Sequence, residues 1–206
     1  RYKRFKKIFK SKIKFVKSYF DNLTFSMRNL SQEKILLSIK TLRKLRLRKG
    51  RLFIIGVGGS AGNASHAVND FRKLCNIDAY SPIDNVSEIT AKTNDEGFDT
   101  IFDTYLKLSN FNSRDILMVF SVGGGSVKRN VSVNLIKAIK FAKKNKGKVI
   151  SIVGKSNGYA HKNSDISILI NTENKKFVTP ISETFQVLIW HLFVSHPLLQ
   201  VNNTKW

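Results

Sequence analysis

The segments LFIIGVGGSA (residues 52–61) and ILMVFSVGGGS (residues 116–126) follow one plan, in which a wholly apolar run leads directly into a turn of glycine and serine. A short run without polar residues is typical of a strand that is buried on both faces of a sheet. After each turn the pattern becomes helical, over about residues 61–74 and 130–144. Strand, glycine turn and helix in succession predict βαβ units and therefore a parallel sheet with helices on both faces.

The rest of the chain extends this alternation. Further apolar runs predict strands at residues 77–80, 149–153 and 166–170. Helices are expected at residues 1–17, from about Asn22, from Ser31 to just before Gly50, and from Pro180 to His196. The predicted fold class is α/β: a three-layer α/β/α arrangement with N-terminal helices and a five-stranded parallel sheet in the flavodoxin-like order 2-1-3-4-5.

The composition is that of one globular domain. The chain has 206 residues, of which 42% are hydrophobic, and this is long enough for one sizeable core and short for two. The single cysteine, Cys75, excludes an internal disulfide framework and a cysteine-based zinc site. The basic N-terminus lacks the apolar segment of a secretory signal, and the longest apolar stretch, residues 187–194, is far shorter than a membrane span. We expect a cytoplasmic protein without a membrane partner.

The charge of the chain is strongly unbalanced. A formal net charge of +22 arises from 36 lysines and arginines against 14 acidic residues, and the excess is concentrated before Arg51. Such a charge favours polyanionic partners, but a merely solvated basic surface explains it equally well. Because no nucleic-acid-binding motif accompanies it, we expect no nucleic-acid partner. We treat residues 1–17 as a basic N-terminal extension of a domain that spans residues 18–206.

The two glycine turns are candidate phosphate sites. In parallel α/β sheets, ligands bind beyond the carboxyl ends of the strands, where both turns lie. Glycine lets the backbone approach an anion closely, while helix N–H groups and serine hydroxyls donate to its oxygens. The residues selected in this way are Gly58, Gly59, Ser60, Ser121, Gly123, Gly124 and Ser126. The alternative is that glycine serves only a tight turn.

A different ligand must also be weighed, because residues 56–61 fit the dinucleotide fingerprint G-x-G-x-x-A. That interpretation requires an acidic residue at the end of the next strand to bind a ribose. Asp78 is at about the right distance, but it begins a strand instead. A dinucleotide site also has no use for the second turn, so we favour a phosphorylated ligand.

Four ionisable residues lie at helical spacing after the turns. His66 and Asp70 are four apart, and Glu183 and His191 are eight apart, so each pair shares one face of its helix. If the two helices meet, these side chains can perform acid–base chemistry or hold a divalent metal through N and O ligands. The alternative is that they are ordinary hydrogen-bonded residues of a core or an interface.

Taken in order, GVGGS, His66-x-x-x-Asp70, TND at residues 93–95, SVGGGS, IVGKSNG and a last helix with His191 resemble the phosphoheptose isomerases of the sugar-isomerase (SIS) superfamily. The resemblance covers about residues 19–199 and points to a divergent subgroup. It implies isomerisation of sedoheptulose 7-phosphate to D-glycero-D-manno-heptose 7-phosphate, or of a similar sugar phosphate. It also implies a homotetramer with sites at subunit interfaces, where four aromatic residues are candidates for packing: Phe5, Phe9, Phe15 and Tyr19.

The resemblance also assigns roles to individual residues. Ser60, Ser121 and Ser126 match phosphate-binding serines, and Asn94 and Asp95 fall in the substrate pocket. The expected catalytic pair is Asp70 and His191, with Glu183 as an alternative base. The residues at or beside positions that hold zinc in some members are His66, Asp70, Glu183 and His191.

The chain departs from the family at several of these positions. Val57 replaces an asparagine, Val122 and Gly123 remove two hydroxyls from the second turn, and Glu183 stands where glutamine is usual. Asp70 is one methylene shorter than the glutamate it replaces, and a misplacement of about 1 Å at a reacting centre can cost roughly a hundredfold in rate. A non-catalytic, phosphosugar-binding regulatory protein is therefore the second hypothesis.

Overall fold

The computed structural model describes the backbone of residues 2–204 and the side chains of residues 12–204. It contains one parallel sheet in the order β2-β1-β3-β4-β5. The strands are β1 (Arg51–Ile55), β2 (Asp78–Tyr80), β3 (Ile116–Ser121), β4 (Lys148–Val153) and β5 (Ile166–Leu169). The parallel pairing and the strand order confirm the predicted fold class.

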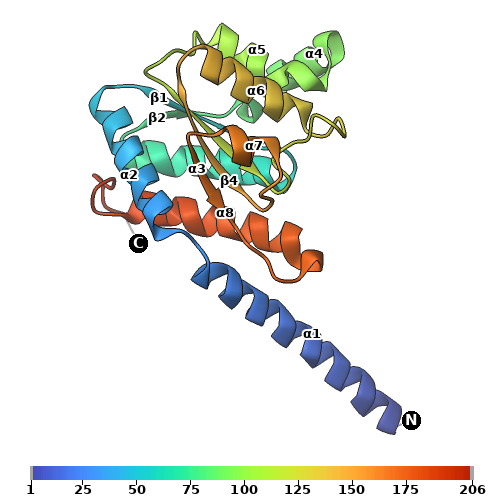
Figure 1. The fold of residues 1–206 in the computed structure, drawn as a ribbon. Coiled ribbons are helices and arrows are strands. Elements are labelled where there is room, and N and C mark those ends of the chain that lie inside the picture. The colour runs from blue at the N-terminus through green and yellow to red at the C-terminus, as the bar shows by residue number, and fades with distance from the viewer. Residues whose placement is uncertain (1, 205–206) are drawn as a thin grey trace.

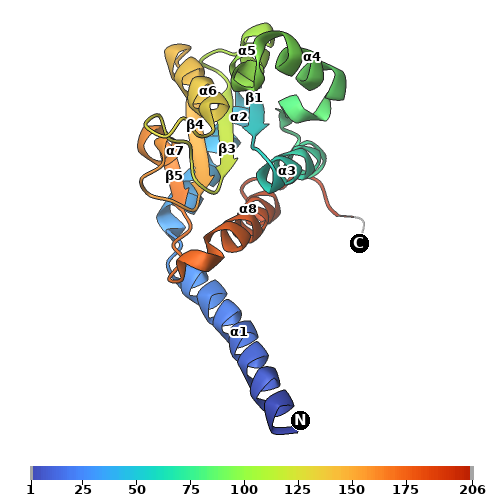
Figure 2. The same cartoon turned by 90° about the vertical axis from the view of Figure 1, so that its right-hand side faces the viewer.

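Helices cover both faces of this sheet (Figures 1 and 2). One face carries α2 (Gln32–Leu47), α3 (Gly59–Cys75) and α8 (Val178–Ser195). The other carries α5 (Ile101–Leu108), α6 (Val133–Lys144) and α7 (Tyr159–Asn163), with α4 (Val86–Glu96) beside α5. Successive strand residues alternate between the two cores, so that Ile54 packs under α3 and α8 while Phe53 packs under α5.

The N-terminal region is one long helix, α1 (Tyr2–Arg28), whereas we expected two. Most of α1 projects from the body of the molecule (Figure 1). Its C-terminal half contacts the loop after β5, where the ring of Phe177 meets Phe15 and Tyr19 edge-on at centroid distances of 5.5 and 5.2 Å. Two of the aromatic residues expected at a subunit interface therefore also contact their own chain.

Two buried polar side chains complete the docking of α1. Asn22 accepts a hydrogen bond from the N–H of Asn174 at 2.8 Å, and Ser26 donates to the carbonyl of Asn171 at 2.6 Å. Phe5 and Phe9 lie outside the described side chains. Since α1 continues through residue 17, the boundary between an extension and a domain at that point stays a prediction.

The remaining differences concern helix limits. The sequence did not predict α4, α5 or α7. The helix expected from about Asn130 begins at Val133, because residues 126–131 form a small antiparallel bridge between Ser126 and Val131. The N-cap prediction at Ser31 is confirmed, since its hydroxyl accepts a hydrogen bond from the N–H of Lys34 at 3.3 Å.

By length and composition alone, one helix among the described residues could cross a membrane, the segment Lys175–Ser195. Half of its apolar window is buried inside the fold, and Ile181, Phe185, Ile189 and Trp190 belong to the core. Its apolar character exceeds what we expected from residues 187–194, and packing against the sheet and α3 explains it.

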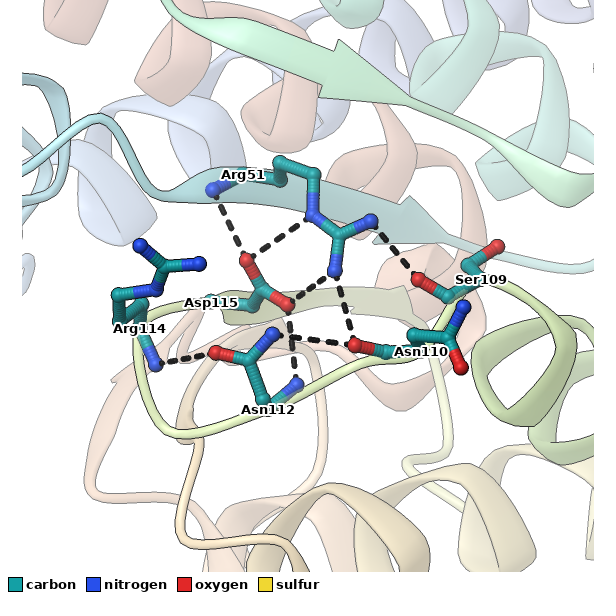
Figure 3. Close-up of polar contacts among 6 residues, drawn as sticks. All are labelled: Arg51, Ser109, Asn110, Asn112, Arg114 and Asp115. Carbon is teal, nitrogen blue, oxygen red and sulfur yellow. Dashed lines mark hydrogen bonds and ion pairs between the residues drawn. The ribbon is translucent and has the colours of Figure 1, made fainter.

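Asp115, the residue before β3, is the centre of a group of hydrogen bonds at the amino ends of β1 and β3 (Figure 3). Asp115 is 1% exposed, and its carboxylate accepts hydrogen bonds from the guanidinium of Arg51 at 2.7 and 3.2 Å and from the Arg51 N–H at 3.0 Å. The N–H of Asn112 donates to it at 3.0 Å. Arg51 donates further to the carbonyls of Ser109 and Asn110, and the hydrogen bond to Asp115 raises the pKa of Arg51. The group ties the start of β1 to the start of β3.

We predict that Asp115→Ala lowers the free energy of unfolding by about 3 kcal/mol, because it leaves the Arg51 guanidinium and two N–H groups without their acceptor. This is the lower end of the range for a broken buried ion pair, since the Arg51 side chain is 28% exposed. Urea denaturation followed by circular dichroism measures the effect. Arg114→Ala is the control, because the Arg114 guanidinium makes none of these contacts (Figure 3), and it should stay within about 0.5 kcal/mol. Equal losses in both variants would contradict the prediction.

Candidate functional site

The two glycine turns lie at the same edge of the sheet, as expected. β1 and β3 are parallel neighbours in which Ile55 pairs with Val119, so the turns that follow both strands emerge on one side. In the first turn Gly58 has φ +64°, a backbone conformation that favours glycine. Ser60, in the first turn of α3, is 2% exposed.

Glu183 lies directly against the first turn. A Cβ atom added at Gly59 would be 2.6 Å from the Glu183 carboxylate, so this carboxylate fills the space that a side chain at residue 59 would need. It therefore sits beside the N-terminus of α3, where the helix dipole stabilises negative charge. This places a carboxylate beside the phosphate turn.

A residue that the sequence analysis missed, Asn63, fixes this arrangement. Its side-chain amide donates to the carbonyl of Glu183 at 3.0 Å and to the Gln186 side-chain oxygen at 2.9 Å. These bonds tie the start of α8 to the first turns of α3. The only sequence signal was that Asn63 lies three positions after Ser60, on the same side of a helix.

His66, Asp70 and His191 form a cluster further along the same two helices. The Asp70 carboxylate lies 3.9 Å from His66 Nε2 and 3.7 Å from His191 Nε2. One potential ligand atom from each residue lies within 4.8 Å of the other two. The Asp70 side chain is 15% exposed, whereas the His66 and His191 side chains are 59% and 48% exposed, so the cluster opens to solvent. The condition that the two helices meet is thus fulfilled for these three residues within one chain.

Trp190 supports this cluster from beneath, and the sequence analysis did not select it. Its buried ring lies 4.7 Å from the His66 ring in an edge-on contact and 3.6 Å from the His191 ring. Aromatic contacts of this kind hold the imidazoles at defined angles.

Glu183 stands apart from the three-residue cluster in the described part of the chain. The eight residues between Glu183 and His191 correspond to about 12 Å along a helix. Glu183 lies at the phosphate-turn end of this distance, and His191 lies at the cluster end. The structure thus brings three of the four expected metal ligands together. Binding of a metal by all four residues stays a prediction.

The second turn uses its serines partly to hold its own shape. Ser121 Oγ accepts a hydrogen bond from the N–H of Gly124 at 2.9 Å, and Ser126 Oγ accepts one from the N–H of Arg129 at 3.3 Å. Gly124 has φ +71°, again in the region that favours glycine. Each serine retains its hydroxyl proton for donation to a ligand.

The IVGKSNG loop after β4 braces the second turn. The N–H groups of Tyr159 and Ala160 donate to the carbonyls of Gly125 and Gly124 at 2.9 and 2.8 Å. Gly158 packs so closely that an added Cβ would lie 2.2 Å from the carbonyl oxygen of Gly123. The shape of the candidate phosphate turn thus depends on its neighbour.

Asn94 and Asp95 lie elsewhere in the chain. Both are exposed on α4, where the Asn94 amide donates to the Asp95 carboxylate at 2.8 Å. In both views α4 lies apart from α8 (Figures 1 and 2). Within one chain, the structure does not bring these two residues to the cluster.

Cys75, at the end of α3, contributes no chemistry to the site. It is fully buried, and this burial raises the pKa of its thiol to about 12. A thiol that stays protonated is neither a nucleophile nor a metal ligand. This agrees with the expectation that any metal site here uses N and O ligands.

Comparison with known proteins gives relatives that include several phosphoheptose isomerases. Over 158 residues the chain is 32% identical to the lincomycin biosynthesis protein LmbN of Streptomyces lincolnensis, which covers 71% of this chain and 56% of that protein. It is 26% identical over 172 residues to the phosphoheptose isomerase of Helicobacter pylori strain P12, covering 81% of this chain and 82% of that enzyme.

Solved structures agree with this fold. The phosphoheptose isomerase from Neisseria gonorrhoeae superimposes with a TM-score of 0.75 at 22% identity, over 90% of this chain and 96% of that one. No model of a known protein family matches the sequence.

We predict that Gly158→Ala lowers the melting temperature by several degrees and weakens sugar-phosphate binding, because its methyl group would collide with the backbone of the second turn. Differential scanning fluorimetry with and without ligand measures both. Gly123→Ala is the matched control, because no heavy atom lies within 4 Å of its added Cβ, and its melting temperature should be nearly unchanged. The same loss of stability in the control would contradict the prediction.

Proposed function

This chain has the SIS fold and is a relative of the phosphoheptose isomerases, and on that basis we propose that it interconverts aldose and ketose phosphates, with sedoheptulose 7-phosphate as substrate. One observation supports this most strongly. The His66–Asp70–His191 cluster lies on the same two helices that place Glu183 beside the first serine-containing turn. A phosphate turn and an acid–base cluster are what an isomerase of sugar phosphates requires.

The phosphate group would bind at the two turns. Ser60, Ser121 and Ser126 supply hydroxyl donors, and the open backbone at Gly58 leaves room for the anion. The space at Gly59 is taken by the Glu183 carboxylate. The sugar chain would extend from there along α8 toward the cluster. The separation of about 12 Å between Glu183 and His191 along the helix favours an extended, multi-carbon substrate.

The reaction would proceed through an enediol. A base removes the proton beside the carbonyl, an acid protonates the adjacent carbon, and a proton moves between the two oxygens. Asp70 and His191, whose carboxylate oxygen and Nε2 are 3.7 Å apart, are our proposed base and acid. The low exposure of Asp70 keeps its carboxylate aimed into the cluster.

A divalent zinc ion fits the same cluster. Two imidazole nitrogens and one carboxylate oxygen are the donor set of many catalytic zinc sites, which keep a fourth position open. Such an ion supplies Lewis-acid polarisation of the substrate oxygens. His66, Asp70 and His191 would hold the ion, whereas Glu183 lies beside Gly59 at the other end of the site.

Assembly would complete the site. Asn94 and Asp95 are remote from the cluster within one chain, so their proposed part in the pocket requires a neighbouring subunit. We therefore propose a homotetramer with interfacial sites, located in the cytoplasm. The second candidate function, sugar-phosphate sensing without turnover, is favoured by the two hydroxyls missing at Val122 and Gly123.

Asp70→Asn should lower kcat for sedoheptulose 7-phosphate by about 10²–10⁴-fold with little change in KM, because it removes a proton acceptor without altering the phosphate turns. Incorporation of solvent deuterium into the sugar, followed by NMR, measures turnover. Asp99→Asn, which changes an exposed carboxylate outside the cluster, should behave as the wild type. Binding of sugar phosphates by the wild type without any exchange would reject the isomerase and favour the sensor.

Zinc binding is tested separately. Protein purified without chelator should contain zinc, and His191→Ala should weaken zinc affinity by at least about a hundredfold, because it removes one of three ligands. His196→Ala, a change outside the cluster, is the control. Glu183→Gln distinguishes three protein ligands from four, and the described geometry predicts an affinity close to that of the wild type. Metal analysis that finds no divalent ion, with no zinc uptake on titration, would exclude the site.

A further inference from the structure

A cavity of about 580 Å³ lies beyond the ends of β4 and β5. Its lining residues are Arg129, Gly154, Lys155, Ser156, Asn157, Leu169, Asn171, Thr172, Lys175, Val178 and Thr179. Three of these described residues are basic and none is acidic. Full positive charges without acidic neighbours create a potential that attracts anions.

One buried hydroxyl group at this cavity also needs a partner. Thr172 lines the cavity, and its Oγ1 has no hydrogen-bond partner among the described residues. Buried polar groups are nearly always hydrogen-bonded in folded proteins, so an unpaired donor beside a cavity points to a polar occupant.

The cavity adjoins the second glycine turn. A neighbouring hollow of about 400 Å³ contains Gly125 and Ser126 of that turn and shares Arg129 and Asn157 with the cavity. His66, Asp70, Glu183 and His191 line neither of the two. The basic cavity is thus continuous with the phosphate turn but separate from the acid–base cluster.

The walls of the cavity are held by the N-terminal helix. Asn171, Thr172 and Lys175 belong to the loop after β5, and α1 fixes this loop through the bonds of Asn22 and Ser26. A cavity with a braced wall is better suited to hold a ligand than a surface of loose lysines, because less ordering accompanies binding.

We propose that this cavity binds a second phosphoryl group, next to the one at the Ser126 turn. The assignment of the first phosphate rests on the proposed function, whereas the charge of the cavity and the unpaired hydroxyl of Thr172 do not. The second phosphoryl group belongs either to the same ligand, as in an organic diphosphate, or to a separate phosphate-bearing effector. Lys155, Lys175 and Arg129 supply charge-assisted hydrogen bonds, and Thr172 supplies a directional donor.

Isothermal titration with inorganic phosphate, in a low-salt chloride buffer, tests the proposal. The wild type should bind two phosphates per chain. The double variant Lys155→Ala/Lys175→Ala should retain one, with affinity for the other reduced at least tenfold, because two charge-assisted contacts are lost. The control is Lys162→Ala/Lys176→Ala, which removes the same charge from exposed lysines that do not line the cavity, and it should bind as the wild type does. One phosphate per wild-type chain, or equal losses in both double variants, would overturn the proposal.

Two further titrations identify the source of the phosphoryl group. If one ligand carries both groups, inorganic diphosphate binds once per chain and excludes sedoheptulose 7-phosphate. If the ligands are separate, inorganic phosphate still binds once per chain when the protein is saturated with sedoheptulose 7-phosphate. Suppose that the wild type binds two phosphates and the double variant binds one, but that the wild type neither binds nor converts sedoheptulose 7-phosphate. That result would reject the proposed function and leave this inference standing.

Discussion

The bond between Arg51 and Asp115 fixes how β1 lies beside β3, and the geometry of the functional edge follows from it. The carboxylate holds both the side chain and the N–H of the first residue of β1, directly before Leu52 pairs with Ile116. A slip of one residue would send every strand side chain to the opposite core, so this register is strongly specified. β3 continues for two residues after Val119, which pairs with Ile55. Ser121 therefore lies at the same edge of the sheet as the first turn.

The second constraint is the helix that carries the rest of the site. Most residues of α8 are apolar and several pack in the core. Its few polar residues make defined contacts. Near its start, Asn63 fixes Glu183 and Gln186 by hydrogen bonds, whereas near its end His191 depends on packing against Trp190. Hydrogen bonds therefore hold the end of the site near the first glycine turn, and aromatic packing holds the cluster end.

Some of this was accessible from the sequence, because it depends on local spacing. Four-residue spacing on a helix predicted that His66 and Asp70 are neighbours, and the alternation of strands and helices predicted the sheet order. What the sequence did not show depends on contacts between distant segments. Glu183 shares a helix face with His191, but its carboxylate is drawn to Gly59 by the packing of α8 on α3. Nor does any local signal show that Asn22 and Ser26 bind the loop after β5, which joins α1 to the body of the protein.

The second turn shows how the charge of this chain bears on its chemistry. Ser121 and Ser126 each use their oxygen as an acceptor for the turn itself, and Val122 and Gly123 carry no hydroxyl. As side-chain donors the turn therefore offers an anion the two hydroxyl protons of these serines. The residues that follow it are Lys128 and Arg129, and the neighbouring loops add Lys155 and Lys175. Full charges attract a phosphate from further away than hydroxyls do, but they orient it less strictly and are weakened by salt. Under the proposed function, recognition at this edge rests more on charge than on hydroxyl geometry, and precise positioning of the reacting carbons falls to the other end of the site, where Asp70 lies close to both imidazoles.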